Sequence, residues 1–221
     1  MSQVLIVGAS RGIGLEFVRQ YREAGDAVVA TARKEEDLLR LRELGATALK
    51  LDVLDAASVS GLAWQIDGHA FDVAVVNAGV NVRSSGLNTP TELDFDKVMH
   101  TNVLGPMRVI PQIAEALAPG ARLAVLSSRM GSIGARTSHS DWLYRASKSA
   151  VNSVLKDTSL ALAGRAICVS LHPGWVRTDM GGAGADIDVS TSVAGMRSVL
   201  ASVKAEHNGS YFNYDGQVIP W

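Results

Sequence analysis

The sequence predicts an α/β fold in which one doubly wound parallel sheet of about seven strands carries helices on both faces. Short apolar runs alternate with longer helical patterns along all 221 residues, which favours a sheet built from strand–helix–strand units. The apolar runs are continuous rather than interrupted at every second residue, as is typical of parallel strands covered on both faces. Because the chain has no repeat, low-complexity tract or linker, we expect a single domain over residues 1–221.

The expected elements alternate along the chain. Strands are predicted over residues 4–7, 27–32, 47–51, 73–76, 123–126, 167–171 and 210–214. Helices are predicted over residues 12–24, 35–43, 56–66, 90–117, 141–163 and 190–203. The helix over 90–117 is expected to break near Gly105-Pro106. Thr89 is its predicted N-cap, with Pro90 at the first helical position and Glu92 completing a capping box.

The composition argues against several classes of protein. Hydrophobic residues make up 47% of the chain and charged residues 19%, so the chain can bury a core and does not resemble a disordered protein. The net charge of −1 gives no indication of a nucleic acid or an anionic membrane as partner. No apolar run approaches the roughly 18–20 residues of a membrane helix, and no targeting segment is apparent, so the expected location is cytoplasmic. The single cysteine, Cys168, is expected to be buried and unreactive.

The first predicted strand runs into a glycine-rich turn, Gly8-Ala9-Ser10-Arg11-Gly12-Ile13-Gly14, where a helix begins. Glycines let the backbone approach a pyrophosphate closely, and the helix N-terminus offers free N–H groups and the positive end of the helix dipole. The spacing differs from the G-x-G-x-x-G dinucleotide pattern, so a tight turn without a ligand stays open as an alternative. The position after the first strand of an α/β pattern favours a dinucleotide site.

The end of the second predicted strand bears on the choice between NAD and NADP. A NAD site places a carboxylate there for the ribose 2′-hydroxyl, whereas this chain has Ala32 followed by Arg33. Arg33 is suited to bind a 2′-phosphate, and Arg11 of the glycine turn can reach the same group. The sequence therefore favours NADP(H) over NAD(H), the alternative being that both arginines are solvated surface residues.

Polar and small residues follow the next two strands. Asp52-Val53 follows the third strand, where an aspartate can accept a hydrogen bond from the adenine amino group. Asn77-Ala78-Gly79 follows the fourth, where small residues permit a cofactor to lie against the backbone. Both are ordinary loop sequences when taken alone.

Tyr144 and Lys148 are the candidate acid/base pair. They are four residues apart on a predicted helix and therefore share one face. A free phenol has a pKa of about 10, and a nearby ammonium lowers that pKa. Ser128 ends the fifth strand, at the sheet edge where ligands bind in such folds, and Asn102 precedes the expected helix break. The alternatives are an exposed pair without a role and a helical asparagine satisfied by backbone.

The run His172-Pro173-Gly174-Trp175-Val176-Arg177-Thr178 follows the sixth strand. Alone it predicts only a turn. The candidate residues, however, fall at the ends of consecutive strands, and the carboxyl ends of parallel strands meet at one edge of a sheet. The shared edge predicts one site.

As a set, these motifs resemble the short-chain dehydrogenase/reductase family over nearly the whole chain, which implies a Rossmann-type fold. The residues that carry the resemblance are Gly8-x3-Gly12-x-Gly14, Asp52-Val53, Asn77-Ala78-Gly79, Asn102, Ser128, Tyr144-x3-Lys148, Pro173-Gly174 and Thr178. The chain is most similar to the C-factor and sniffer-like carbonyl reductase branch, through Ser127–Ile133, Tyr144–Lys148 and the ending Tyr214-Asp215-Gly216 with Pro220-Trp221.

The resemblance implies an oxidoreductase that transfers hydride between NADP(H) and a small-molecule carbonyl or alcohol, without a metal. It implies that Tyr144 is the acid/base, that Ser128 binds the reacting oxygen, and that Lys148 holds the nicotinamide ribose and lowers the tyrosine pKa. It also implies that Asn102 holds a water linking Lys148 to solvent, and that Thr178 anchors the nicotinamide carboxamide. The implied cofactor-binding residues are Gly8, Ser10, Arg11, Gly12, Ile13, Gly14, Arg33, Asp52, Val53, Asn77, Ala78, Gly79, Tyr144, Lys148, Pro173, Gly174, Val176 and Thr178.

Two features depart from the family's commonest pattern. The stretch from Ser128 to Tyr144 is longer, with the extra residues in 131–141, and the segment after Thr178 is short and glycine-rich at 181–184. A mobile, open site with loose substrate selection is the resulting hypothesis. Four large residues are expected either to line an apolar pocket or to pack in the core: Met130, Trp142, Trp175 and Met180.

Two other functions stay open at this point. One is a C-factor-like NAD(P)-binding signalling or regulatory protein, and the other is an NAD-linked alcohol dehydrogenase working in the oxidative direction. Relatives commonly pair through the helix that carries the tyrosine, so a homodimer or homotetramer is expected. The small residues Ala146, Ala150 and Ser153 would allow a second helix to approach closely.

Overall fold

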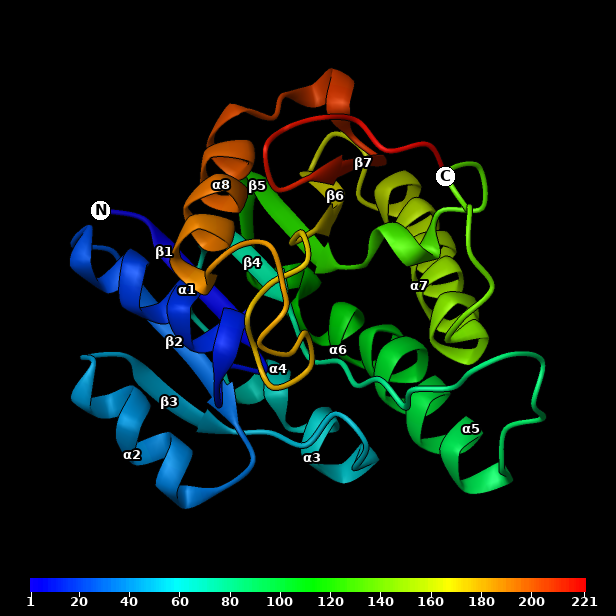
Figure 1. Ribbon diagram of the computed structural model, residues 1–221. Helices are drawn as coiled ribbons and strands as arrows, with labels where there is room; N and C mark the ends of the chain where they lie inside the picture. Colours follow the sequence, from blue (N-terminus) through cyan, green and yellow to red (C-terminus); the bar gives the residue numbers. More distant parts are fainter.

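The computed structural model describes residues 1–221 and contains one seven-stranded parallel sheet (Figure 1). The sheet order is β3-β2-β1-β4-β5-β6-β7, which confirms the predicted doubly wound parallel sheet. The strands are β1 (Gln3–Val7), β2 (Ala27–Ala32), β3 (Thr47–Lys50), β4 (Phe71–Val76), β5 (Leu117–Leu126), β6 (Ala166–His172) and β7 (Ser210–Asn213).

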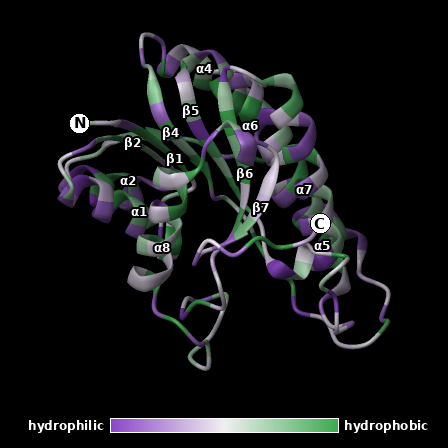
Figure 2. Ribbon diagram, turned by 90° about the horizontal axis from the view of Figure 1, so that it is seen from above, coloured by the Kyte–Doolittle hydropathy of each residue, from purple (hydrophilic) through white to green (hydrophobic).

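Helices cover both faces of the sheet, as Figure 2 shows. On one side lie α1 (Gly12–Glu23), α2 (Glu35–Glu43) and α8 (Val189–Ser202). On the other lie α3 (Ala56–Ser60), α4 (Leu62–Gln65), α5 (Glu92–Met99), α6 (Gly105–Ile113) and α7 (Trp142–Ala161). No helix combines the length and the apolar character that crossing a lipid bilayer requires.

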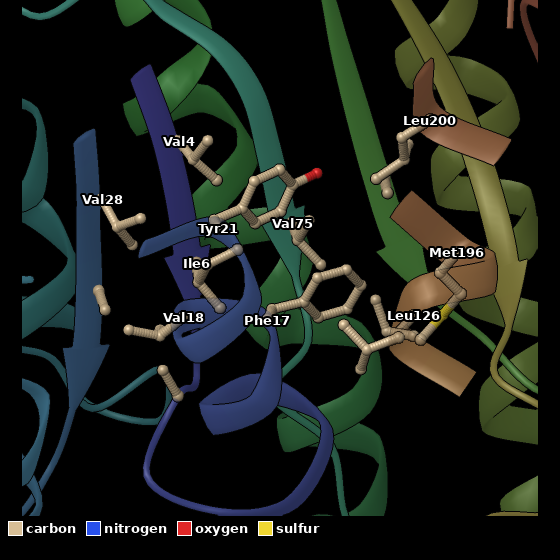
Figure 3. Close-up of a cluster of buried hydrophobic side chains, with 14 of the residues drawn as sticks. Val4, Ile6, Phe17, Val18, Tyr21, Val28, Val75, Leu126, Met196 and Leu200 are labelled. Atoms are coloured by element: carbon tan, nitrogen blue, oxygen red, sulfur yellow. The ribbon is translucent and has the colours of Figure 1, made fainter. Parts of the chain in front are cut away.

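Each face of the sheet buries its own apolar core. On β1, Val4 and Ile6 point toward α1, where they pack in one cluster with Phe17 (Figure 3). Leu5 and Val7 belong to the cluster on the opposite face. Because successive side chains of a strand alternate between faces and both faces are covered, every position of β1 favours an apolar residue. This explains the continuous apolar runs in the sequence.

The start of α5 differs from the prediction. Thr91, not Thr89, is the N-cap, and its Oγ1 accepts a hydrogen bond from the Asp94 N–H at 3.1 Å. Glu92 is then the first helical residue, so it completes no capping box with Thr89. The predicted cap was wrong because two threonines flank Pro90 and the sequence alone does not decide between them.

The helix break predicted near Gly105-Pro106 is also absent. The chain continues from α5 through a π-helical turn at His100–Leu104 into α6. Pro106 has no N–H to continue the helical hydrogen bonds, and the wider π-helical turn directly before α6 accommodates it without ending the helix.

Two further boundaries differ. The helix predicted over 56–66 divides at Gly61 into α3 and α4, since glycine is a weak helix former. β5 begins at Leu117 rather than at 123, and its early residues pair irregularly with Phe71.

The strand order reverses at β1. β2 follows β1 on one side of it, whereas β4 pairs on the other side. Such a reversal leaves a crevice above the carboxyl ends of the central strands. Gly8 and Asn77 directly follow β1 and β4, so both lie at this crevice.

Candidate active site

The turn after β1 is built from glycines that leave no room for side chains. Gly8 has a left-handed φ of 87°, and a Cβ added to Gly14 would lie 2.2 Å from the Gly8 carbonyl oxygen. Asn77 Nδ2 donates a hydrogen bond to that same oxygen at 2.6 Å, and the Gly8 N–H donates to Thr31 Oγ1 at 3.0 Å. The contacts fasten the turn to the ends of β2 and β4, so its backbone has a fixed path along the crevice.

Helix α1 begins in this turn with a free N-terminus. Its first turn contains no acidic residue, and no side chain caps it. Free N–H groups and the positive end of the dipole suit an anion. Thr178 lies beside the turn, with its Cγ2 3.5 Å from the position of a Cβ on Gly12. Together these residues fit the pyrophosphate of a dinucleotide, because the glycine turn lets the backbone approach closely and the uncapped start of α1 offers free N–H groups.

Ser128, Tyr144 and Lys148 are buried together at the carboxyl end of β5. Tyr144 and Lys148 lie one turn apart on α7, and Ser128 follows β5. The Lys148 ammonium nitrogen is 5.7 Å from the centroid of the Tyr144 ring and donates to the Leu126 carbonyl oxygen at 2.8 Å. The structure thus brings together three of the four residues predicted to carry the chemistry.

Burial dominates the acidity of both titratable groups. It raises the pKa of Tyr144 to about 12, and the hydrogen bond with Ser128 acts in the opposite, smaller sense. Burial also lowers the pKa of Lys148 to about 8. In the protein alone, desolvation therefore outweighs the lowering of the tyrosine pKa that was expected from the ammonium. Tyr144 is held as the phenol, which is the form that can give a proton.

The lowered pKa of Lys148 predicts a pH-dependent stability. Between pH 8 and the ordinary lysine value of 10.5, the unfolded chain binds a proton at Lys148 that the folded protein has released. The free energy of unfolding therefore gains a contribution that rises with pH across this window. Lys148→Met, which removes the buried charge, is expected to have a higher melting temperature than the wild type at pH 8. The difference in melting temperature between the variant and the wild type should narrow toward pH 10.5. A difference that stays constant with pH in thermal denaturation would contradict the lowered pKa of Lys148 as its cause.

Asn102 lies in the π-helical turn and is 1% exposed. Its Oδ1 accepts from the Val80 N–H at 2.8 Å, and its Nδ2 donates to the Val80 carbonyl oxygen at 2.8 Å and to Ser147 Oγ at 3.0 Å. A Cβ on Gly79 would lie 3.4 Å from both Asn102 Oδ1 and Lys148 Nζ, so the two residues meet at Gly79. The Asn102 amide fastens the β4–α5 loop to α7. A water relay would have to use its second Oδ1 lone pair or its main chain.

A cavity of about 470 Å³ lies at the ends of β2 and β3. Arg33 and Asp52, both predicted to bind the cofactor, line it together. Arg33 is exposed and has no carboxylate partner. Arg11, in contrast, forms an ion pair with Asp179 across the mouth of the glycine turn. Val53 is buried and packs under Gly105, with Cγ2 3.1 Å from the position of a Cβ there.

The loop over residues 173–188 is hydrogen-bonded to itself and to the loop that follows β4. The Gly182 N–H donates to the Thr178 carbonyl oxygen at 2.8 Å. Arg83 Nη2 donates to the Met180 carbonyl oxygen at 3.1 Å, so the two loops meet above the sheet edge. The loop has a defined form, and its predicted mobility stays a hypothesis.

Trp142, Trp175 and Met180 lie on the surface. They are 39%, 53% and 44% exposed, which excludes core packing for them. Each indole N–H has a backbone partner, from Trp142 to the Asn88 carbonyl oxygen at 3.1 Å and from Trp175 to the Gly181 carbonyl oxygen at 3.0 Å. The two rings are therefore held in place beside the loops that border the site.

Gly131 sets the distance between the turn after Ser128 and helix α7. A Cβ on Gly131 would lie 2.7 Å from the Lys148 carbonyl carbon and 2.8 Å from its oxygen. Ser149 Oγ donates to the Gly131 carbonyl oxygen at 2.8 Å. After Gly131 the chain moves away from the surface of α7. The Gly134 N–H then donates to the Trp221 carbonyl oxygen at 2.9 Å. Backbone therefore packs directly on backbone between the serine and the lysine.

The family model described as short chain dehydrogenase matches residues 2–186. The chain belongs to the short-chain dehydrogenase family. C-signal from Myxococcus xanthus is 39% identical over 153 residues, which cover 68% of this chain and 92% of that protein.

Solved structures of similar proteins agree with this membership. Carbonyl reductase Sniffer of D. melanogaster is 30% identical and covers 100% of both chains, with a TM-score of 0.92. A short-chain dehydrogenase/reductase from Burkholderia multivorans with bound NADP is 31% identical, with a TM-score of 0.91, and the match covers 100% of this chain and 99% of that chain.

Two cations of this short-chain dehydrogenase lie beside the predicted cofactor residues but were not predicted. Lys50 lines the cavity with Arg33, because Lys50 pairs with Ala32 in the sheet register. Arg40 reaches from α2 and donates to the Ser10 carbonyl oxygen at 3.0 Å. Lys50 could have been found from the sequence, because it is a charged residue at the end of an apolar strand. Arg40 had none, because its contact depends on how α2 packs.

Proposed function

We propose that this short-chain dehydrogenase reduces a ketone or aldehyde with NADPH. The observation that carries the proposal is the burial of Ser128, Tyr144 and Lys148 together at the sheet edge, beside a glycine cradle that fits a dinucleotide. The NADP in the Burkholderia multivorans structure supports the cofactor, and the likeness to carbonyl reductase Sniffer supports the reaction class.

When bound, NADPH supplies the hydride that reduces the carbonyl carbon. Tyr144 gives its phenolic proton to the carbonyl oxygen, and Ser128 donates a hydrogen bond to that oxygen, so two donors stabilise the developing negative charge. Lys148 binds the nicotinamide ribose, and its ammonium stabilises the phenolate that remains. Asn102 keeps Lys148 in register with the β4–α5 loop, and the proton returns to Tyr144 through Lys148. In the reverse direction the Tyr144 phenolate removes the proton of an alcohol.

The proposed cofactor site runs along the crevice. The glycine turn binds the pyrophosphate, Asp52 accepts from the adenine amino group, and Thr178 anchors the nicotinamide carboxamide. The cofactor is proposed to lie close to the backbone where the residues are small or are glycines. The remaining residues of the site are Ser10, Ile13, Val53, Asn77, Ala78, Gly79, Pro173, Gly174 and Val176.

Arg33 is proposed to select NADP(H) over NAD(H). Arg33→Asp is expected to raise the Kd for NADPH roughly 10–100-fold, because a charge-assisted hydrogen bond to the 2′-phosphate is lost. The Kd for NADH should change little, since NADH lacks that phosphate. Fluorescence titration with both cofactors measures the ratio.

Arg42→Asp is the matched control, because Arg42 is an exposed arginine of α2 that pairs with Glu35. It makes the same change of charge at a residue outside the proposed site, and the cofactor ratio should stay close to the wild-type value. Equal weakening of NADPH and NADH in Arg33→Asp would contradict the role of Arg33.

The reaction itself is tested by mixing the protein with NADPH and a panel of ketones and aldehydes and following the nicotinamide absorbance. Oxidation of NADPH that depends on a carbonyl compound is expected. A parallel test with NAD⁺ and alcohols distinguishes this reaction from that of an NAD-linked alcohol dehydrogenase. Such an enzyme would turn over NAD⁺ with an alcohol faster than NADPH with a carbonyl compound.

The likeness to C-signal favours a second candidate, a signalling or regulatory protein that binds NADP(H). Tight NADPH binding without turnover of any carbonyl or alcohol would support this candidate and contradict the first.

Association of subunits and the cytoplasmic location stay predictions. On α7, Ala146 and Ser153 are exposed and Ala150 is half-buried, so small side chains line the surface through which a homodimer or homotetramer is proposed to pair. Light scattering of the purified protein measures the oligomeric state.

A further inference from the structure

A cluster of polar side chains is buried between α7 and the sheet, below the proposed catalytic residues. Ser170 pairs with Val125 on one side and Tyr211 on the other, so these three side chains point to the same face. Ser127 lies two residues beyond Val125 and therefore shares that face. Asn152 is four residues beyond Lys148 on α7 and continues the stripe that faces the sheet.

The hydrogen bonds inside this cluster are incomplete. Ser170 Oγ donates to Asn152 Oδ1 at 3.1 Å. Three other buried polar atoms of the cluster have no hydrogen-bond partner in the protein: Ser127 Oγ, Asn152 Nδ2 and Tyr211 Oη. Ser127, Asn152 and Tyr211 are only 3%, 4% and 1% exposed. An unsatisfied buried polar group is costly, and three in one cluster call for a shared partner.

The surroundings of the Tyr211 hydroxyl indicate what that partner is. Burial raises the pKa of Tyr211, while Ser127 and Asn152 lie near enough to its hydroxyl to act in the opposite direction. Yet neither makes a hydrogen bond with it of acceptable geometry. Neighbouring polar groups that do not satisfy one another can share one small bridging molecule with several hydrogen-bonding positions.

We propose that Ser127 Oγ, Asn152 Nδ2 and Tyr211 Oη bind one internal water, and that Tyr211 acts through it as a positioning residue for Ser128. The donors and acceptors are compatible, because the water can accept from Asn152 Nδ2 and from the Tyr211 hydroxyl and can donate to Ser127 Oγ. Three partners are the usual number for a buried water. The Tyr211 ring stacks on Trp221, with centroids 5.4 Å apart and planes at 23°.

The water bears on the chemistry through the chain itself. Ser127 makes the last backbone hydrogen bond of its strand, from its N–H to the Leu171 carbonyl oxygen at 2.8 Å. Ser128 is the next residue, and its Oγ accepts from the Met130 N–H at 3.2 Å. Holding the Ser127 side chain therefore fixes the peptide from which the Ser128 hydroxyl projects. This second part of the inference rests on the proposed function, whereas the water itself does not.

Tyr211→Phe tests both parts, because it removes one hydroxyl and keeps the ring that stacks on Trp221. If the hydroxyl binds a water, its loss leaves the other partners short of a hydrogen bond, and the melting temperature should fall by about 2–4 °C. If the hydroxyl has no partner, its removal should leave the melting temperature unchanged or raise it, which would overturn the proposal. Tyr21→Phe is the matched control, since Tyr21 is a buried tyrosine on the opposite face of the sheet. It should leave the activity unchanged, and the shift in melting temperature from the loss of its hydroxyl beside Arg197 should add to that of Ser127→Ala.

Ser127→Ala provides a second route to the same answer. Both single variants remove a partner of one water, so the double variant should lower the melting temperature by less than the sum of the two shifts. Additive shifts would contradict a shared water. A crystal structure that shows no water within about 3.2 Å of all three atoms would also overturn it.

The positioning role is read from kinetics. In Tyr211→Phe, kcat is expected to fall roughly tenfold while the KM for NADPH stays within about twofold of the wild type, because the change affects the proton-donating side of the site. A kcat equal to that of the wild type would contradict the positioning role even if the water is found. If the wild type reduces no carbonyl compound, the proposed function and the positioning role fail together, and the melting temperatures still decide the water site.

Discussion

Replacing Tyr144 by phenylalanine is expected to lower kcat for carbonyl reduction by roughly 10²–10⁴-fold, because the change removes only the hydroxyl that gives the proton. The phenylalanine ring fills the same buried space beside Lys148, so the fold and the NADPH site should be retained. The nicotinamide absorbance measures kcat, and fluorescence titration measures the Kd for NADPH, which should stay within about twofold of the wild type.

The same Tyr21→Phe variant serves as the control, because it removes a phenolic hydroxyl from the opposite face of the sheet. Wild-type turnover in Tyr144→Phe would show that another group gives the proton. Loss of turnover together with loss of NADPH binding would instead show that the tyrosine acts on the cofactor site.

Gly14→Ala is expected to abolish useful NADPH binding. The added Cβ would lie 2.2 Å from the Gly8 carbonyl oxygen and 2.7 Å from Asn77 Nδ2. The turn must therefore move, and the hydrogen bonds it offers to a pyrophosphate are lost with it. Losing two charge-assisted bonds corresponds to a Kd for NADPH higher by about 100-fold or more. The overpacked turn should also destabilise the protein by about 1–3 kcal/mol, as measured by chemical denaturation.

Gly184→Ala is the matched control. Gly184 has no atom within 4 Å of an added Cβ and no left-handed φ, so the same methyl group should change neither the Kd for NADPH nor the stability appreciably. Unchanged NADPH binding in Gly14→Ala would mean that the dinucleotide does not lie against this turn.

Much of the fold could be predicted because local signals and the architecture agree. The continuous apolar runs of β1 and β6 report burial on both faces, and this predicts a parallel sheet before any strand pairing is known. The candidate site followed from the same logic. Tyr144 and Lys148 share a helix face through their spacing, and Ser128 meets them because it ends a neighbouring strand.

Other features depend on contacts between distant segments. The ion pair of Arg11 with Asp179 and the approach of Arg40 to Ser10 are set by packing that no local pattern encodes. The polar cluster around Tyr211 is of the same kind, because it requires the register of three strands against α7. The acidity of Tyr144 was also missed, since the spacing to Lys148 reveals a nearby charge but not the depth of burial.

Because of the backbone contact at Gly131, the spacing between the serine turn and the lysine helix does not depend on the path of the chain that follows. The distance from the serine turn to the lysine helix is fixed by a missing side chain, whereas the chain over residues 132–141 departs from α7 and returns to it. Insertions or deletions in that excursion can alter its contact with the C-terminal end, where Gly134 meets Trp221, without altering the spacing of the groups that handle the proton. This segment is therefore a place where the sequence can diverge while that spacing stays the same.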